Sequence, residues 1–456
     1  MEILDLLKEK KISQVTGLLD SMNNVDIATL LEEINLECAI KLFRLLKTDD
    51  AAEVFSYLNT QTQQKIVEII SEKEITNIVN ELFMDDTVDL IEAMPANVVK
   101  KILKSTKPEL RTEINKFLAY PDNSAGSIMT SEYLDLKQGM TVNQALERIR
   151  KIGDFKETVN SCYCVDATKH LIGVVSIKDL LLAQPDTLID DIMTTNVIFT
   201  TTHADQEDVS RTITKYDILS IPVVDGEERM VGIITIDDII DVIEEEATED
   251  IQKMAAITPT HTPYLKTSVW RLWLNRMPWL LILLISATFT GLIINSNEDV
   301  LNLPVVGIIL TGCIPMLMDT GGNAGSQSSV TIIRSLALGE VKLKDFLKVM
   351  WKEMRVAVIM STTLAAATFV KLMVIDRLYN VESGFLIAAV ICLTMFLTVL
   401  LAKIVGCALP IIAKACKLDP AVVTSPFITT IVDVLSLSIY VSMSVAILGN
   451  LYPAIG

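Results

Sequence analysis

The chain has 456 residues, more than a single hydrophobic core holds, so its length predicts about three domains. Half of the residues are hydrophobic and 21% are charged, which indicates a water-soluble part and a membrane part. The formal net charge of −18 argues against nucleic acid as a partner and favours cations. The cysteines lack CxxC spacing, the histidines are isolated and no nucleophile–base set is present, so we expect reduced cysteines and no enzymatic activity.

Residues 1–122 have the pattern of short amphipathic helices, with Leu, Ile and Val recurring every three or four positions. An internal repeat places an acidic pair before an apolar segment twice, at Asp49–Asp50 and at Asp85–Asp86. We expect helix pairs that bury their apolar faces by stacking into a small superhelical domain. The acidic pairs have two interpretations, helix N-caps or part of a cation site. Capping does not explain Glu53 and Asp89, which lie one turn further along.

A second internal repeat spans residues 123–185 and 186–243. Each unit opens with Ile-Met-Thr, and the units end in IGVVSIKDLL and VGIITIDDII, which predict an apolar strand, a polar turn and a helix. The two units resemble a tandem pair of cystathionine-β-synthase-type (CBS) domains. This resemblance implies an α/β regulatory sensor, often of adenine nucleotides such as ATP. Asp179 occupies the position expected for the ribose-binding Asp of these domains, and the alternative interpretation is a helix N-cap.

The second unit runs into an acidic helical segment, which we assign to a connecting helix over residues 244–270. The carboxylates of the segment DDIIDVIEEEATEDIQKM, which starts in the second unit, group on adjacent faces as Asp238, Asp241 and Glu245, and as Glu246, Glu249 and Asp250. Like charges at helical spacing each destabilise a helix by about 0.2–0.5 kcal/mol, and divalent cations would remove that repulsion. A solvated acidic face is the ordinary explanation. The position between a sensor pair and a membrane domain favours a switch. His261-Thr262-Pro263 predicts an interruption of the helix.

Residues 271–456 contain five apolar runs, at about 277–295, 303–333, 355–375, 384–409 and 424–449. Lys and Arg gather before the first run, after the second, and between the fourth and fifth, which predicts the cytoplasmic side. We therefore expect a cytoplasmic N-terminal half and a C-terminus outside. The second run contains PMLMDTGGNAGSQ, whose Gly and Pro content predicts either a broken helix beside a water-filled cavity or close helix packing.

The last run carries a carboxylate, Asp433, roughly 20 Å along a helix from Asp419. A carboxylate at such depth costs about 2.5–3.5 kcal/mol on insertion scales. It belongs to a polar stripe formed by Ser425, Thr429, Asp433, Ser436 and Tyr440. A polar stripe inside a membrane predicts a water-filled path for a cation. The alternative is a buried carboxylate bonded to a neighbouring helix.

These parts in this order resemble the MgtE-type magnesium transporters. The matching segments are RMPWLLILL in the first run, PMLMDTGGNAGSQSS and ALGEV in and after the second, and LDPAVVTSPFITTIVD at the last. The resemblance implies a multidomain membrane protein with an all-α superhelical N domain, an α/β CBS pair, a connecting (plug) helix and a five-helix transmembrane domain over 271–456. It also implies a homodimer in the bilayer of the cell membrane, with an ion path between subunits lined by the second and fifth spans.

The activity implied by the resemblance is import of Mg²⁺, with pore closure by cytoplasmic Mg²⁺ bound between the N domain, the CBS pair and the plug helix. By position, Asp433 matches the pore carboxylate and Asp419 the carboxylate at the cytoplasmic mouth, while Ser425, Thr429 and Asn323 line the pore. The positions for regulatory Mg²⁺ are Glu53, Asp85, Asp89, Asp205, Glu207, Asp217, Asp238, Asp241, Glu246, Glu249 and Asp250.

Two other functions compete with this interpretation. A CBS-gated transporter of another divalent metal, such as Mn²⁺ or Co²⁺, is disfavoured because the Asp433 stripe offers no His, Cys or Met ligand. A membrane-anchored nucleotide sensor that transports nothing predicts spans without a polar stripe, and Asp433 argues against it.

Overall fold

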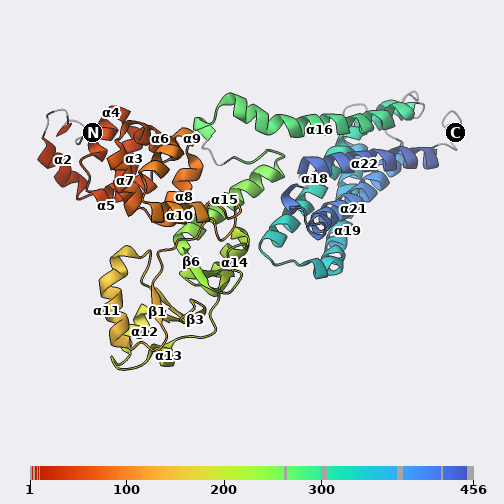
Figure 1. The fold of residues 1–456 in the computed structure, drawn as a ribbon. Coiled ribbons are helices and arrows are strands. Elements are labelled where there is room, and N and C mark those ends of the chain that lie inside the picture. Colours follow the sequence, from red (N-terminus) through yellow and green to blue (C-terminus); the bar gives the residue numbers. More distant parts are fainter. Residues whose placement is uncertain are drawn as a thin grey trace. The chain divides into compact units, whose positions relative to one another are not determined.

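The computed structural model describes residues 3, 6–7, 9, 11–260, 264–298, 306–376, 384–422 and 425–448, without the side chains of Ser105, Lys266 and Ser425. The chain divides into two compact units, Met1–Ile243 and Glu244–Gly456, whose helices and strands are labelled in Figure 1. The border falls inside one helix, α15 (Ile236–Met254). The interruption predicted at 261–263 lies outside the described residues.

The first unit begins with short helices that stack on one another. Alternate helices are in contact along the chain, α3 on α5, α5 on α7, and α7 on α9. Helices of this length are marginal alone, so stacking of their apolar faces holds them in place. This confirms the predicted superhelical N domain. The bounds are α2 Ile12–Leu19, α3 Asn24–Glu33, α4 Leu36–Phe43, α5 Thr48–Ser56, α6 Thr60–Ile69, α7 Glu72–Glu81, α8 Met84–Ala93, α9 Ala96–Ser105 and α10 Pro108–Phe117.

The repeated acidic pairs are not helix N-caps. Lys47 caps α5 and Phe83 caps α8, neither with a side-chain bond, so each acidic pair lies within the first helical turn. Carboxylates there are favoured by the helix dipole. The capping interpretation of Asp49–Asp50 and Asp85–Asp86 was therefore wrong, although their location at helix starts was right.

The two CBS units have the same topology. Each holds a three-stranded sheet, β1 (Asp135–Lys137), β2 (Ser161–Val165) and β3 (Leu171–Ser176) in one, and β4 (Thr200–Thr201), β5 (Ser220–Val224) and β6 (Met230–Thr235) in the other. The first pair of strands is parallel and the second pair antiparallel in both sheets, so the sequence repeat is also a structural one. Their helices are α11 Val142–Ile152, η1 Gly153–Phe155, α12 Ile177–Leu182, α13 Ile189–Ile192 and α14 Gln206–Tyr216.

Helix α15 ends in a well-defined stop. Ala256 adopts a left-handed conformation with φ 56°. The N–H of Ala256 donates to the carbonyl of Lys253, and the N–H of Ile257 donates to the carbonyl of Gln252. These two bonds form a Schellman motif, which fixes the last turn of the helix although alanine rather than glycine occupies the strained position.

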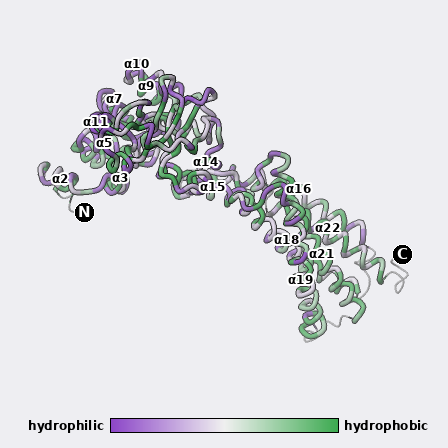
Figure 2. Tube along the Cα trace, turned by 90° about the horizontal axis from the view of Figure 1, so that it is seen from below, coloured by the Kyte–Doolittle hydropathy of each residue, from purple (hydrophilic) through white to green (hydrophobic). Residues whose placement is uncertain are grey.

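The second unit contains α16 (Val269–Ser296), α18 (Val306–Ala337), α19 (Phe346–Val370), α21 (Phe385–Ala415) and α22 (Ser425–Leu448), with short helical turns η2 Tyr264–Lys266, η3 Leu343–Asp345, η4 Lys371–Ile375 and η5 Pro420–Val422. Among the described residues, four segments are long and apolar enough to cross a membrane, namely α16, α19 with its flanking turns, α21 and α22. Figure 2 shows the contrast in hydropathy between these helices and the first unit. Helix α18 falls outside that group, so the count of five spans stays a prediction.

Helix α18 is continuous through Pro315 and the glycine-rich motif. The broken-helix interpretation was therefore wrong, and close packing accounts for the glycines. A Cβ at Gly321 or Gly322 would collide with Thr398 or Thr429, and a Cβ at Gly406 of α21 would collide with the backbone of Gly325. Small residues let helix backbones approach in this way.

We predict that Gly406→Ala destabilises the membrane unit by about 1–3 kcal/mol, because the added methyl group must push α21 away from α18. The measurement is thermal unfolding of the purified protein in detergent. Gly291→Ala is the matched control, since no atom lies within 4 Å of a Cβ there. Equal melting temperatures for the two variants would contradict the prediction.

Candidate functional site

Helix α18 carries a polar face that the rest of the chain leaves exposed. Asp319, Asn323 and Gln327 recur every four residues and are all exposed, whereas Leu317, Gly321 and Ala324 on the opposite side are buried among the other helices. Residues four apart lie above one another on a helix, so these side chains form one continuous stripe. An exposed polar stripe on a helix of an apolar bundle requires a polar neighbour or water.

Asp433 on α22 lies near this stripe. It is half-buried, and its Oδ1 is buried without a hydrogen-bond partner among the described residues. The carboxylate of Asp319 is close enough to act on it electrostatically. Thr429, one turn before Asp433, places its hydroxyl 3.5 Å from that of Ser326 on α18. The structure therefore brings Asp433 and Thr429 of α22 close to Asp319 and Ser326 of α18, and the role of these residues in a pore stays a prediction.

Two residues of the predicted stripe on α22 do not belong to this polar surface. Ser436 and Tyr440 are each 1% exposed, and the Tyr440 hydroxyl donates to the carbonyl of Leu310 on α18 at 2.9 Å. The prediction of one polar face along the whole helix was wrong, because the second half of the stripe is used in packing within the chain. The side chain of Ser425 lies outside the described ones.

Asp319 is a residue that our sequence analysis did not single out. The signal was available, because Asp319 precedes Asn323 by one helical turn and so shares its face.

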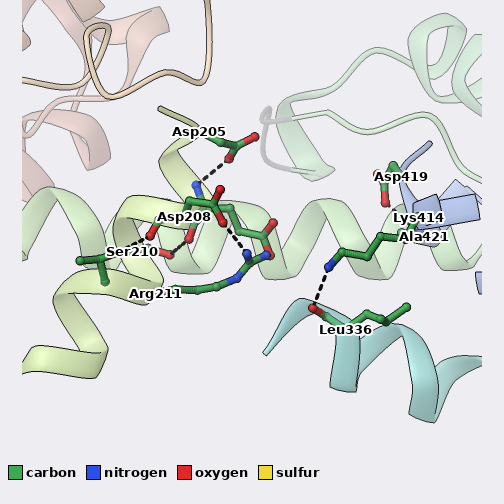
Figure 3. Close-up of polar contacts among 10 residues, drawn as sticks. Asp205, Asp208, Ser210, Arg211, Leu336, Lys414, Asp419 and Ala421 are labelled. Carbon is green, nitrogen blue, oxygen red and sulfur yellow. Dashed lines mark hydrogen bonds and ion pairs between the residues drawn. The ribbon is translucent and has the colours of Figure 1, made fainter. Parts of the chain in front are cut away.

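Asp419 is held at the start of a short turn that precedes α22. Its Oδ1 accepts from the backbone N–H of Ala421 at 2.8 Å, and its Oδ2 accepts from the ammonium of Lys253 on α15 at 2.6 Å. The same ammonium contacts Glu249 at 2.5 Å. Burial alone would lower the pKa of Lys253, but the bonds to Asp419 and Glu249 raise it, so the side chain stays charged. Nearby, the ammonium of Lys414 donates to the carbonyl of Leu336 at the end of α18 (Figure 3).

The first unit contains an acidic cluster, defined here as Asp85, Asp86, Glu157, Asp237 and Asp238. Asp85 and Asp86 come from α8 of the N domain, Glu157 from the loop after η1, and Asp237 and Asp238 from the first turn of α15. Their carboxyl groups act on one another electrostatically. The N–H of Met84 also donates to Glu132 at 3.4 Å, so the N domain contacts the CBS pair beside this cluster.

Burial and mutual repulsion raise the pKa values of Asp85, Asp86 and Glu157. Desolvation, followed by the charges of Asp238 and Asp237, raises the pKa of Glu157 to about 8. Desolvation and the same two neighbours raise the pKa of Asp86 to about 6. The pKa of Asp85 is also raised well above its ordinary value by burial and by Asp238. The packed interface is therefore unfavourable when these groups are ionised, unless a cation compensates them.

The acidic cluster includes Asp85 and Asp238 from the predicted regulatory set and adds Asp86, Glu157 and Asp237. Within the described parts of the chain, no three Asp, Glu, His or Cys side chains converge closely enough to form a complete metal site. A set of oxygen donors nevertheless suits Mg²⁺, and Glu157 Oε2 is buried without a hydrogen-bond partner among the residues that the structure describes. Glu53 lies at the edge of the cluster, since it and Asp86 both act on the Tyr57 hydroxyl.

The sequence could have indicated Asp86 and Asp237, which adjoin predicted residues, but Glu157 lies in a loop with no distinguishing pattern.

Of the remaining predicted regulatory residues, Asp241 acts electrostatically on Asp238 of that cluster. Asp205 caps α14, accepting from the Glu207 N–H at 2.8 Å, and Arg211 pairs with both Glu207 and Asp208 (Figure 3). Asp217 ends the same helix in a left-handed conformation with φ 51°. Asp89 is exposed on α8, and Asp241, Glu246 and Asp250 lie along α15 with Glu249.

The Asp179 carboxylate is hydrogen-bonded within the first turn of its own helix. The N-cap of α12 is Ser176, whose hydroxyl donates to the Asp179 carboxylate at 2.7 Å and accepts from the Asp179 N–H. Asp179 is exposed, at the third position of the helix rather than at the cap. The N-cap interpretation was therefore wrong by three residues, and the ribose interpretation stays a prediction.

A bundle of membrane-length helices with a polar face, joined to a CBS pair and an acidic superhelix, defines a membrane transport protein with a regulatory soluble part. The family model described as a divalent cation transporter matches residues 314–443, that of the MgtE intracellular N domain matches 22–123, and that of the CBS domain matches 125–186 and 189–245.

The magnesium transporter MgtE of Thermus thermophilus is 33% identical and covers 97% of each chain. That of Bacillus subtilis is 31% identical over 99% of this chain and 98% of its own. A solved cytosolic domain of the Mg²⁺ channel MgtE in complex with ATP is 33% identical, with a TM-score of 0.50, over 53% of this chain and 98% of that chain.

The chain belongs to the MgtE family, which consists of membrane transporters and not of enzymes. The similarity covers both units, so the membrane unit and the cytoplasmic N domain are parts of one transporter.

We predict that Glu157→Gln stabilises the contact between α8 and the CBS pair when divalent cations are chelated. An acid whose pKa is raised in the packed state loses stability as pH rises from its ordinary value of 4.5 to about 8, and glutamine has no such loss. Hydrogen exchange of α8 in the full chain, compared at equal pH, should be about fivefold slower in the variant at pH 8.5, equivalent to roughly 1 kcal/mol.

The difference in the hydrogen-exchange rate of α8 between Glu157→Gln and the wild type should become smaller as the pH is lowered toward 5. Glu113→Gln, which removes an exposed acid from α10, is the matched control. Faster exchange in Glu157→Gln at pH 8.5 would mean that the charge of Glu157 stabilises the interface.

Proposed function

We propose that this protein carries Mg²⁺ into the cytoplasm through a path lined by α18 and α22. The observation that carries the proposal is the exposed stripe of Asp319, Asn323 and Gln327 beside Asp433, within an apolar bundle. A carboxylate kept at membrane depth without a basic partner is stabilised by a passing cation. The relatives named as magnesium transporters support Mg²⁺ as that cation.

The path would lie between two copies of the chain. The stripe on α18 is exposed in the single chain, and lipid is a poor neighbour for Asp319 and Asn323. A twofold axis through this face would oppose the two stripes and bring two copies of Asp433 toward one conduit. The homodimer in the bilayer of the cell membrane, with five spans and the C-terminus outside, belongs to this proposal.

The chemistry of the stripe suits a hydrated ion. Mg²⁺ gives up its water reluctantly and requires octahedral geometry, with ligands at about 2.0–2.1 Å. Hydroxyl, amide and carboxylate groups can bind such an ion through its water shell, with Thr429 one turn before Asp433 on α22, Asn323 on the stripe of α18, and Asp419 at the cytoplasmic mouth. Ca²⁺ holds a larger and more variable shell, so the width of the path would favour Mg²⁺.

The second candidate is transport of another divalent metal, such as Mn²⁺ or Co²⁺. The family description of a divalent cation transporter leaves room for it. The oxygen-only stripe does not favour softer metals over Mg²⁺. Uptake of Mg²⁺, Mn²⁺, Co²⁺ and Ca²⁺ by the same reconstituted protein separates the two candidates.

We predict that Asp433→Asn lowers Mg²⁺ uptake at least tenfold, because the amide keeps the size of the side chain but removes the charge that balances the ion. Uptake is measured in liposomes containing the purified protein, and growth of a magnesium-requiring host gives a second readout. Asp345→Asn, which removes a carboxylate at the start of α19, should transport as the wild type does. Normal uptake by Asp433→Asn would exclude Asp433 from the path.

We further propose that cytoplasmic Mg²⁺ closes the path by acting at the acidic cluster. Asp85, Asp86, Glu157, Asp237 and Asp238 would hold the ion, and its charge would remove their mutual repulsion. Without it the N domain would loosen from the CBS pair, and with it the start of α15 would be held. Several weak sites, including Asp205, Glu207, Asp217 and the acids along α15, would together give a steep response.

We predict that millimolar Mg²⁺ protects the full chain from protease at two places, the linker near Ser127 and α15 near Glu246. Protection follows because the bound cation draws together domains that repel one another without it. Asp85→Asn combined with Asp238→Asn should be protected already in chelator and should gain little from Mg²⁺, while Glu113→Gln behaves as the wild type. If Mg²⁺ does not slow digestion of the wild-type protein, closure by Mg²⁺ at the acidic cluster is contradicted.

ATP is a proposed ligand of the CBS pair, supported by the ATP complex of the similar cytosolic domain. Asp179 is the candidate for the ribose contact, although its carboxylate already accepts a hydrogen bond from Ser176. Titration of the full chain with labelled ATP, for the wild type and Asp179→Ala, tests both points.

A further inference from the structure

One basic side chain in the last turn of α15 joins two carboxylates of the second unit. The ammonium of Lys253 lies 2.5 Å from Glu249, one turn earlier on the same helix, and 2.6 Å from Asp419. The side chains of Lys253 and Glu249 are each 24% exposed. This contact is thus partly shielded from solvent, unlike Lys348 with Asp345, in which the lysine side chain is 84% exposed.

The position of Lys253 is fixed by the backbone that follows it. The Schellman stop at Ala256 uses the carbonyls of Gln252 and Lys253. Beyond it, the Thr258 N–H donates to the carbonyl of Asn275 on α16, and the Thr260 N–H donates to the Gln252 side chain. The end of α15 is therefore tied to the start of the membrane unit, and the reach of the lysine is limited to the neighbourhood of Asp419.

Each carboxylate oxygen of Asp419 has a hydrogen-bond partner in its own chain. One oxygen accepts the Ala421 N–H and the other accepts Lys253. The ammonium of Lys253 therefore lies at Oδ2, where a metal ion could otherwise bind. A tethered charge competes with an ion from solution at an effective concentration in the millimolar range, which is comparable to cytoplasmic Mg²⁺.

We propose that Lys253 is a positioning residue that occupies, at Asp419, the place of a metal ion and so holds the end of α15 at the mouth of the path. The inference rests on the proposed function and adds to it a positive charge, supplied by the chain, that does at Asp419 what a bound cation would do. Glu249 and Asp419 would repel each other without the ammonium, so a cation between them adds to the hydrogen bond that ties the end of α15 to α16. Because the chain supplies that cation, this contact forms without Mg²⁺, and Mg²⁺ closure acts on an end of α15 that is already held.

The test uses the full chain in liposomes, with Mg²⁺ uptake measured against the Mg²⁺ concentration on the cytoplasmic side. Lys253→Met keeps the length of the side chain and removes its charge. The concentration that halves uptake should rise about fivefold, the low end of coupling between linked sites. Lys253→Arg should restore the wild-type value, because it keeps the positive charge. Lys348→Met is the matched control for the loss of a lysine paired with an aspartate.

The outcomes separate this inference from the proposed function. Absence of Mg²⁺ uptake by the wild type would overturn the function itself. Uptake by the wild type with an unchanged midpoint in Lys253→Met would overturn only the role of Lys253. Equal shifts for Lys253→Met and Lys253→Arg would also overturn it, since the charge would then be irrelevant. If Lys253→Met does not fold, as judged by its melting temperature in detergent, Lys253→Gln replaces it with the same expectations.

Discussion

Both units hold carboxylates close to one another, and this concentration of negative charge is the constraint on which the rest of the structure depends. In the first unit, five carboxylates meet between the N domain and the CBS pair. In the second unit, Asp319 and Asp433 act on each other within a helical bundle. Natural proteins avoid such arrangements unless something compensates them, because burial and like charge both oppose ionisation. A mobile dication would compensate this charge reversibly, which is why we propose it both for transport and for regulation.

Much of the architecture follows from patterns in the sequence. Helical periodicity predicted the superhelix, the repeated Ile-Met-Thr units predicted the CBS pair, and the apolar runs predicted the helices of the second unit. These patterns indicate which residues are buried. Burial depends on the hydrophobicity of each residue, so it can be predicted from the order of residues in the sequence. Asp433 could be identified from the sequence as well, because a carboxylate is unexpected inside an apolar run.

What could not be predicted depended on contacts between distant segments. Ser436 and Tyr440 continue the spacing of Asp433, yet α18 covers them, and only the packing of α18 on α22 decides where the polar surface ends. The glycines of α18 allow either a break or a close approach, and their partners on α21 settle the matter. Glu157 lies in a loop, and Lys253 is a single basic residue in an acidic helix. Their importance arises from neighbours more than seventy positions away in the sequence.

Helix α15 belongs to both compact units, because the border between them falls within it. Asp238 in its first turn and Lys253 in its last are separated by fifteen residues, or roughly 22 Å of rigid rod. A rod of that length works as a lever. A tilt of about 7° imposed at the acidic end displaces the far tip by roughly 2.7 Å, about the length of one hydrogen bond, so a small rotation would part an ammonium from a carboxylate in the gating that we propose.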